Sequence, residues 1–265
     1  MLIGPEKLKN CFLEDDEGEI LYRDNPELGA SPYEYCPTCR KRGTYRYKGV
    51  EHDCDCMEQL QLHKHYLLAG IGVLYQRLDW DHYTGDPEVV KTLQEYVRRH
   101  DDYVEQGLGL LFTGPRGIGK TMLATLVLKE LLRAGYRCRY ATYSSAMEMY
   151  TTGWRDLDVK RRFEDTFLRT RVLLLDDMGR EAKSANNMQE STFEHILRNR
   201  VQSCRPTILT TNLNYDDLEE GYGAAALSLL SEQSMVMEMT GDNFRPKANA
   251  RKFDEPEEGE RRPIF

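Results

Sequence analysis

The spacing of hydrophobic positions changes along this 265-residue chain, and the change indicates where its elements lie. Between residues 58 and 105, leucines and valines recur at the spacing of amphipathic helices. From residue 108 on, short apolar runs alternate with helix-like stretches. These runs predict strands at 110–112, 140–142, 171–175, 207–211 and 235–239, and helices at 122–132 and 193–201.

This alternation predicts the fold class. Strands that alternate with helices form a parallel sheet with helices on both faces. The run at 171–175 is apolar enough to be buried on both sides, as parallel strands are. We therefore expect an α/β fold with a doubly wound parallel sheet. Ahead of it, Asp86 and Pro87 predict a helix start, with Asp86 as the N-cap.

Composition divides the rest of the chain. Residues 34–57 hold four cysteines around an aromatic and basic ribbon, and the mean hydropathy of -0.65 is low enough to predict polar ends. We expect an acidic flexible N-terminus at 1–33, a metal-binding module with its following helix at 34–68, the α/β domain at 69–248 and a disordered tail at 249–265.

Charge and hydropathy exclude some classes of protein. A formal net charge of -8 argues against a protein that coats duplex DNA by charge. Residues 36–50 nevertheless contain five cations and no acid, so this segment is suited to nucleic acid or an acidic partner. No run approaches the length of a membrane span, and the first ten residues lack the apolar core of a secretion signal. We expect a cytoplasmic protein.

A complete phosphate-binding motif, G-x-x-x-x-G-K-[ST], lies between an apolar strand and an amphipathic helix. Its glycines let backbone amides turn toward phosphate oxygens, and the helix N-terminus adds a positive dipole end. Lys120 is expected to neutralise the β- and γ-phosphates, and Thr121 to offer its hydroxyl to Mg²⁺. The residues expected to contact ATP are Gly114, Pro115, Arg116, Gly117, Ile118, Gly119, Lys120 and Thr121.

Two further strand ends carry polar residues. Asp176 and Asp177 follow the apolar run at 171–175, and ligands of open α/β sheets bind at such strand ends. Asp176 is expected to hold Mg²⁺ through water, and Asp177 to orient or deprotonate the attacking water; a solvated turn is the alternative. Asn212 ends the next strand, where it either holds the hydrolytic water or caps a turn.

The cysteine pairs predict a zinc site. Seven cysteines and no export signal argue against a disulfide framework, and two close pairs joined by a ribbon suit tetrahedral thiolate ligation. Alternating aromatic and basic residues in the ribbon predict a β-hairpin. The second pair is tighter than usual, which leaves His52 or Cys11 as a substitute ligand. His63 and His65 do not share a helix face and are expected at the surface. The four ligands are Cys36, Cys39, Cys54 and Cys56.

The three strand-end motifs, in this order, resemble the DnaC/DnaI/IstB branch of AAA+ ATPases. The likeness runs from about Ala69 to Arg251 and includes GIGVLYQRLDWDHY, LLLDDMGR, RPTILTTNL and GDNFR. It implies a Walker A motif at 114–121, a Walker B motif at Asp176 and Asp177, sensor 1 at Asn212 and a sensor-2-like arginine at Arg245.

A cysteine-rich N-terminal module on such an ATPase resembles phage-type helicase loaders of the DnaI kind. The resemblance implies an ATP hydrolase that docks on a replicative DNA helicase, oligomerises with ATP and contacts single-stranded DNA in DNA replication. Two rivals remain: an IstB-like transposition ATPase acting on a transposase and duplex DNA, and a nucleotide-binding adaptor with little hydrolysis.

The segment 143–162 is the candidate for single-strand contacts, because it mixes stacking surfaces with cations. The alternative is an amphipathic helix with Trp154 in the core. The residues concerned are Tyr150, Trp154, Arg155, Lys160, Arg161 and Arg162.

The sequence departs from the family pattern at 226–232, where an arginine finger is usual and no arginine is present. Such a finger contributes roughly 10³–10⁵ in rate. Either Arg180, Arg198 or Arg200 serves instead, or hydrolysis is slow.

Overall fold

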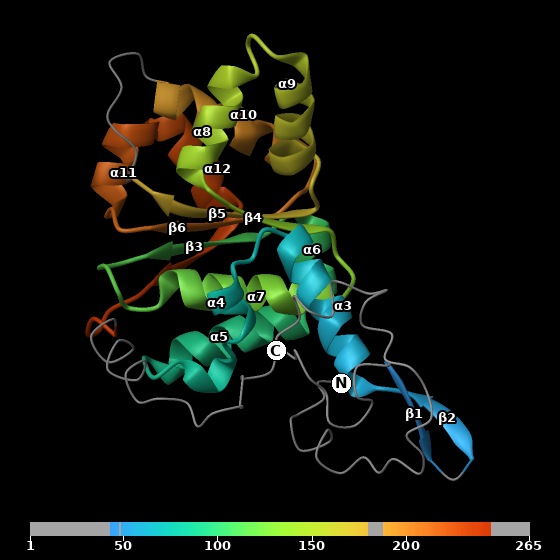
Figure 1. Cartoon of the computed structure of the whole chain (residues 1–265). Coiled ribbons are helices and arrows are strands. Elements are labelled where there is room, and N and C mark those ends of the chain that lie inside the picture. Colours follow the sequence, from blue (N-terminus) through green and yellow to red (C-terminus); the bar gives the residue numbers. More distant parts are fainter. Residues whose placement is uncertain (1–42, 48, 180–187, 245–265) are drawn as a thin grey trace. The chain divides into compact units, whose positions relative to one another are not determined.

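A computed structural model describes residues 43–47, 49–179 and 188–244 (Figure 1). Their contacts divide them into two compact units. The smaller unit contains the described residues up to Leu68, together with Gly72–Leu78, and the larger contains Ala69–Ile71 and the described residues from Asp79 on. Each unit is described on its own.

The smaller unit contains the hairpin expected between the cysteine pairs. Strands β1 (Thr44–Tyr47) and β2 (Val50–Asp53) are antiparallel, with Thr44 opposite Asp53. The backbone amide of Cys54 donates to the carbonyl of Gly43 at 2.7 Å and closes the open end of the hairpin.

Two helices follow, α3 (Asp55–Leu68) and α4 (Val73–Gln76). His65 is exposed, but the expectation that His63 is also exposed is wrong. The buried amide oxygen of Gln76 lies 2.6 Å from Nδ1 of His63. A buried polar group needs such a partner, and α4 supplies one that helical spacing along α3 alone does not reveal.

The larger unit is built on a five-stranded sheet in the order β4-β5-β6-β3-β7. Every pairing in it is parallel. The predicted parallel sheet is therefore confirmed, with each expected strand present. The strands are β3 (Gly109–Thr113), β4 (Cys138–Thr142), β5 (Val172–Met178), β6 (Thr207–Thr211) and β7 (Ser234–Glu238).

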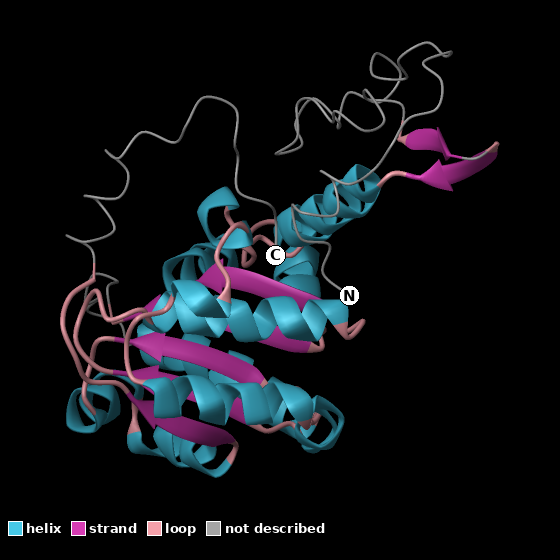
Figure 2. Ribbon diagram, turned by 90° about the horizontal axis from the view of Figure 1, so that it is seen from below, coloured by secondary structure: helices cyan, strands magenta, loops and turns pink. Residues whose placement is uncertain are grey.

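Helices cover both faces of this sheet, as expected for a doubly wound fold. In Figure 1, α5 and α7 lie below the sheet, and α8, α10 and α12 lie above it. Figure 2 views the face that α5 and α7 cover, with helices in front of the strands. Asp86 caps α5 by accepting from the amide of Glu88, and Pro87 begins that helix, as predicted. The helices are η2 (Trp80–His82), α5 (Pro87–Arg98), α6 (His100–Gln106), α7 (Lys120–Arg133), α8 (Tyr143–Thr152), α9 (Leu157–Phe163), η3 (Glu164–Leu168), α10 (Met188–Gln202), α11 (Tyr215–Tyr222) and α12 (Ala224–Glu232).

The face that α8, α10 and α12 cover holds an apolar core. Side chains of β5 such as Leu173 and Leu175 pack there with Phe193 and Ile196 of α10 and with Leu227 of α12. Because β5 is buried along nearly its whole length, its polar end is held rigidly.

Within the part of the chain that the structure describes, no helix is both long and apolar enough to cross a membrane.

One cation is enclosed in this layer. Arg200 of α10 is fully buried, and burial, together with two neighbouring arginines, lowers its pKa to about 9. Its guanidinium donates to the side chain of Thr207 and to the carbonyls of Phe167, Thr170, Arg171 and Pro206. It therefore joins α10 to η3 and to the starts of β5 and β6.

Candidate functional site

The predicted phosphate-binding loop joins β3 to α7, between neighbouring strands β6 and β7. Gly119 is the N-cap of α7 with φ 93°, a left-handed conformation that side-chain-bearing residues rarely adopt. At Gly117, φ is 84° and a Cβ would overlap the side chain of Asn243. Both glycines are therefore required by the shape of the loop and by what packs against it.

Lys120 begins α7 and is buried, with 7% of its surface exposed. Its ammonium donates to the carbonyls of Gly114 at 2.7 Å and Pro115 at 2.6 Å, and to Oδ1 of Asn212 at 2.8 Å. These bonds place the cation inside the curve of the loop and join it to the end of β6. Lys120 and Asn212 thus meet although 92 positions separate them, a contact that the sequence analysis did not specify.

Asp176 is the centre of a second cluster, at the end of β5. Its side chain is 4% exposed. Oδ1 accepts hydrogen bonds from the hydroxyls of Thr121, at 2.8 Å, and Thr210, and Oδ2 accepts one from Tyr140 at 2.7 Å. Three donors from three different elements hold the carboxylate in one orientation.

The donor set in this cluster suits Mg²⁺. A carboxylate and a hydroxyl are hard oxygen ligands of the kind that Mg²⁺ takes when it keeps several waters. Thr121 and Asp176, the two expected magnesium residues, are in direct contact. When bound, the ion would neutralise charge on the phosphate oxygens next to Lys120.

Asp177 has an unusual backbone. Its φ is 61°, and the pairing of β5 with β6 shifts register between Leu175 and Met178. The amide of Asp177 donates to the hydroxyl of Thr210 at 3.0 Å. In a regular strand two successive side chains point to opposite faces, whereas a bulge re-aims one of them. The irregularity lies at the residue that the sequence analysis expects to orient the attacking water.

The remaining residues of the loop differ in their exposure to solvent. Ile118 is buried at 1% exposure, and Pro115 and Arg116 are exposed at the surface of the loop. The sensor-2-like Arg245 lies outside the described residues. The two residues ahead of it contact the loop, since Asn243 packs against Gly117 and the amide of Phe244 donates to the carbonyl of Gly117 at 2.9 Å.

Residues that the sequence analysis did not identify complete the site. Tyr140 and Thr210 bond the two oxygens of Asp176, and their strands pair directly with β5. Thr210 lies two positions before Asn212, a spacing that puts both on one face of a strand and could have revealed it. Tyr83 packs its ring against Gly119 and makes an edge contact with Phe244, at 6.0 Å between ring centroids. No short-range pattern indicates that last contact.

The structure excludes one candidate for an arginine finger. Arg200, on α10, is fully buried and cannot reach the nucleotide of a neighbouring copy. Arg198 is half exposed and forms an ion pair with Glu194 at 2.6 Å, and Arg180 lies outside the described residues. The segment 226–232 belongs to α12, whose apolar side chains pack into the core.

The zinc residues lie largely beyond what is described. Cys36, Cys39 and Cys11 are outside the described residues. Cys54 is buried at the base of the hairpin, while His52 is exposed. Among the described residues, no group of three or more metal-binding side chains gathers at one place.

The segment 143–162 has two interpretations, a site of single-strand contacts or an amphipathic helix with Trp154 in the core. Trp154 is 64% exposed, so the alternative that it belongs to the core is wrong. Arg155, Lys160, Arg161 and Arg162 are exposed as well.

Comparison with known proteins gives a family. The model of the IstB-like ATP-binding proteins matches residues 75–252, about two thirds of the chain. A protein named as an ATP-binding protein of insertion sequence IS5376, from Geobacillus stearothermophilus, is 26% identical over 148 residues, 54% of this chain and 57% of its own length. A counterpart named for IS21, from Pseudomonas aeruginosa, is 26% identical over 55% of each chain. The match thus spans little more than half the length of these relatives.

Solved structures give the same fold. A DnaC helicase loader superposes with a TM-score of 0.57 at 25% identity, over 64% of this chain and all of that one. DnaI superposes with a TM-score of 0.55 at 22% identity, over 64% of this chain and 94% of that one. The chain belongs to the IstB-like ATP-binding protein family, and its larger unit has the P-loop AAA+ fold of the DnaC/IstB branch.

Proposed function

We propose that this protein is an ATP-hydrolysing loader that docks on a replicative DNA helicase and helps to place it on single-stranded DNA. The observation that carries the proposal is that Lys120 bonds to Asn212 and Thr121 bonds to Asp176 at one sheet edge, so the residues proposed for phosphate binding, sensing and Mg²⁺ binding lie close together. The likeness to a DnaC helicase loader over that protein's whole chain supports the choice of partner.

The chemistry follows from the positions of these side chains. Lys120 exchanges its bonds to the loop carbonyls for bonds to the β- and γ-phosphates, and Thr121 with Asp176 would hold Mg²⁺. Asp177 orients the attacking water and accepts its proton, and the terminal phosphoryl group passes to that water with ADP as the leaving group. Asn212, bonded to Lys120, reports the loss of the γ-phosphate to β6.

Hydrolysis is proposed to be slow in the isolated chain. Arg200 is buried, and the described helix α12 replaces the family's arginine finger with apolar side chains. An ATP-bound homo-oligomer is then the state that engages the helicase, and hydrolysis releases it. A nucleotide-binding adaptor with little hydrolysis is the limiting case, which a steady-state ATPase assay with and without helicase would identify.

A second candidate is favoured by the family match. The matched relatives are named for insertion sequences, so an ATPase that acts on a transposase and duplex DNA fits the same nucleotide site. The two candidates share ATP chemistry and differ in the partner protein and in the DNA.

A binding experiment separates them. The purified chain is immobilised with ATP and Mg²⁺ and offered the replicative helicase or the transposase from the same cell, with Lys120→Ala as the control. ATP-dependent retention of the helicase supports the loader. Retention of the transposase, with no affinity for the helicase, contradicts it and supports transposition.

We also propose that Cys36, Cys39, Cys54 and Cys56 bind one zinc ion. The buried Cys54 closes the hairpin between the pairs, as a ligand of a zinc ribbon would. Metal analysis of protein purified without chelator should give one zinc per chain, and Cys36→Ser should lose it while ATP binding persists. Protein without zinc contradicts this proposal and leaves the ATPase proposal untouched.

A further inference from the structure

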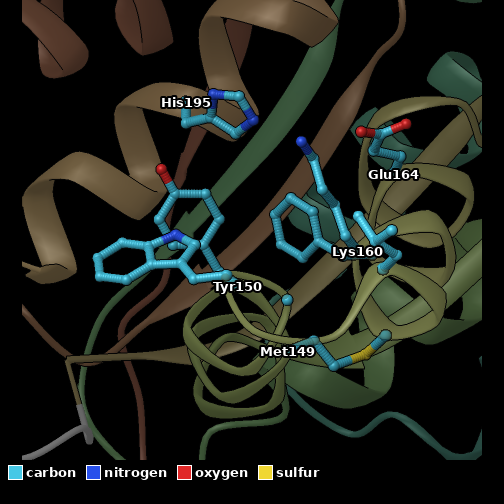
Figure 3. A pocket seen from close by; sticks show the side chains of 9 residues that line it. Met149, Tyr150, Lys160, Glu164 and His195 are labelled. Atoms are coloured by element: carbon cyan, nitrogen blue, oxygen red, sulfur yellow. The ribbon is translucent and has the colours of Figure 1, made fainter.

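A pocket of about 300 Å³ lies in the larger unit between α8, α9, η3 and α10 (Figure 3). None of its lining residues belongs to the phosphate-binding loop or bonds to Asp176. In Figure 3, the side chains of Tyr150, Lys160 and His195 are directed toward the same space. The lining residues are Met149, Tyr150, Gly153, Trp154, Leu157, Lys160, Phe163, Glu164 and His195.

Aromatic rings form the wall of this pocket. The ring of Tyr150 lies 5.3 Å from Phe163, 5.8 Å from Trp154 and 5.4 Å from His195, measured between centroids. Trp154 and Leu157, at the mouth, are 64% and 72% exposed. Large exposed apolar side chains at the mouth of a pocket are typical of a ligand-binding or interaction site. The aromatic rings suit an occupant with a flat ring face.

The charges around the mouth favour an anionic occupant. Asp156 accepts from the amides of Asp158 and Val159 as the N-cap of α9. Asp158 pairs with Arg161 at 3.6 Å, and Glu164 pairs with Arg169 at 3.0 Å.

Two cations here are not held in ion pairs of this kind: Lys160, which lines the pocket, and Arg155, which follows the lining residue Trp154 in the chain. Among the described residues, neither Arg155 nor Lys160 forms a salt bridge, and both are exposed. Asp156, Asp158 and Glu164 thus have partners within the protein, whereas Arg155 and Lys160 are exposed to solvent. Burial lowers the pKa of His195, with nearby Lys160 acting in the same direction and Glu164 opposing it, so the imidazole is neutral at neutral pH.

We propose that this pocket accepts one unstacked base of a single-stranded nucleic acid, with Trp154 stacked on it and Arg155 and Lys160 on the adjoining phosphates. This rests on the single-strand contact in the proposed function and deepens it. In a single strand, each base has a flat ring face and is flanked by phosphates. The base would stack on the aromatic walls of the pocket, and the phosphates would pair with the exposed Arg155 and Lys160. A paired base inside a duplex is not free to enter, since extrusion costs a few kcal/mol.

The chain carries its own reporter for a test. Its two tryptophans are Trp80 and Trp154, so Trp80→Phe leaves Trp154 as the fluorophore. This variant of the full chain is titrated, with ATP and Mg²⁺, with an oligothymidylate and with an abasic oligomer of equal length and charge. Stacking predicts that the oligothymidylate quenches Trp154 fluorescence and that the abasic oligomer does not.

Affinity gives an independent measure. Trp154→Ala should weaken oligothymidylate binding between about fivefold and a hundredfold, and should leave abasic binding unchanged. Tyr215→Ala, which removes an exposed ring from α11, is the matched control and should change neither. Lys160→Ala should reduce the slope of log affinity against log salt by about 0.7, while Lys91→Ala on α5 should not.

The outcomes distinguish this inference from the proposal beneath it. Oligothymidylate that binds without quenching, with Trp154→Ala as tight as wild type, overturns the base pocket and keeps the single-strand contact. Absence of any oligonucleotide binding overturns both. Loss of helicase retention in Trp154→Ala, with DNA affinity unchanged, assigns the pocket to an apolar side chain of a protein partner and also overturns the inference.

Discussion

The nucleotide site and the α8–α10 pocket are built in opposite ways. At the nucleotide site, Lys120, Thr121 and Asp176 already hydrogen-bond to the loop, to Asn212 and to each other. At the pocket, ring contacts hold the walls while Trp154, Arg155 and Lys160 face solvent.

This difference determines how each region responds to a ligand. ATP must replace bonds that the site makes within itself, so its affinity depends on exchange of hydrogen bonds in a water-poor environment. The pocket needs no such exchange, because its rings gain contacts that the solvent does not provide. A single substitution should therefore cause a large loss of ligand affinity at the nucleotide site and a smaller loss at the pocket.

The most damaging substitution is expected on α10, at the buried Arg200. Arg200→Met removes the donor from four carbonyls and a hydroxyl in the interior, of which the carbonyl of Pro206 keeps the amide of Leu173, and should lower the free energy of unfolding by about 4 kcal/mol. Urea denaturation measures this loss. Arg198→Met, two positions along the same helix, removes only an exposed ion pair and should cost less than about 1 kcal/mol. Equal midpoints for the two variants would show that the Arg200 network is not what joins α10 to η3.

The next effect concerns the nucleotide site alone. Lys120→Ala removes the cation that the motif supplies and should weaken ATP binding at least about a hundredfold, roughly 3 kcal/mol. Titration calorimetry measures this, with Lys91→Ala as a control of equal charge change. Trp154 fluorescence should be unaltered. ATP affinity like that of the wild type would refute the assignment of the loop.

The third prediction concerns Lys129, on the helix that follows the phosphate-binding loop, and the pH dependence of the free energy of unfolding. It lies on α7, is 1% exposed, and burial, with Arg133 acting in the same direction, lowers its pKa to about 7 from 10.5. Between pH 7 and pH 10.5 the unfolded chain binds more protons than the folded chain, so the free energy of unfolding rises with pH. The charged side chain lowers the free energy of unfolding most below pH 7.

The variant Lys129→Met should therefore be more stable than wild type by about 2 kcal/mol at pH 6.5, with the gap closing toward pH 9.5. Denaturant titrations at the two pH values measure it, and the exposed Lys91→Met should show no such trend. A gap that stays constant with pH would mean that Lys129 is charged in the folded protein.

The smallest expected effect is at Tyr140. Its hydroxyl fixes Oδ2 of Asp176, so Tyr140→Phe should raise the Mg²⁺ concentration needed for half-maximal hydrolysis about fivefold, near 1 kcal/mol, without changing Mg²⁺-free nucleotide binding. Tyr136→Phe, whose hydroxyl bonds to Asp101 instead, is the matched control. An unchanged Mg²⁺ dependence would restrict Tyr140 to a packing role.

Much of the nucleotide site could be predicted because its parts are local in sequence or end on strands. Gly114 to Thr121 is a continuous motif, and Asp176 and Asn212 each follow an apolar run that predicts a strand. Parallel strands bring their carboxyl ends to one edge, so the meeting of Lys120 with Asn212 follows from the fold class. The hairpin between the cysteine pairs follows in the same way from its alternating residues.

Other features depend on contacts that no spacing reveals. The bulge that gives Asp177 a positive φ arises from the mismatch between β5 and β6, and the bond from Tyr140 depends on which strand lies beside β5. The surface position expected for His63 is wrong and Arg200 is excluded as a finger for the same reason, since the burial of both depends on partners on other elements.

The sequence by itself determined the class of fold, the loop that holds phosphate and the acids at the end of β5, because each is encoded by residue types at short range. Only the tertiary structure decided that Arg200 is structural, that Tyr140 and Thr210 hold Asp176, and that Tyr150 and His195 meet in one pocket. Side chains 45 positions apart become neighbours only through the packing of α8 against α10, which depends on the whole core between them.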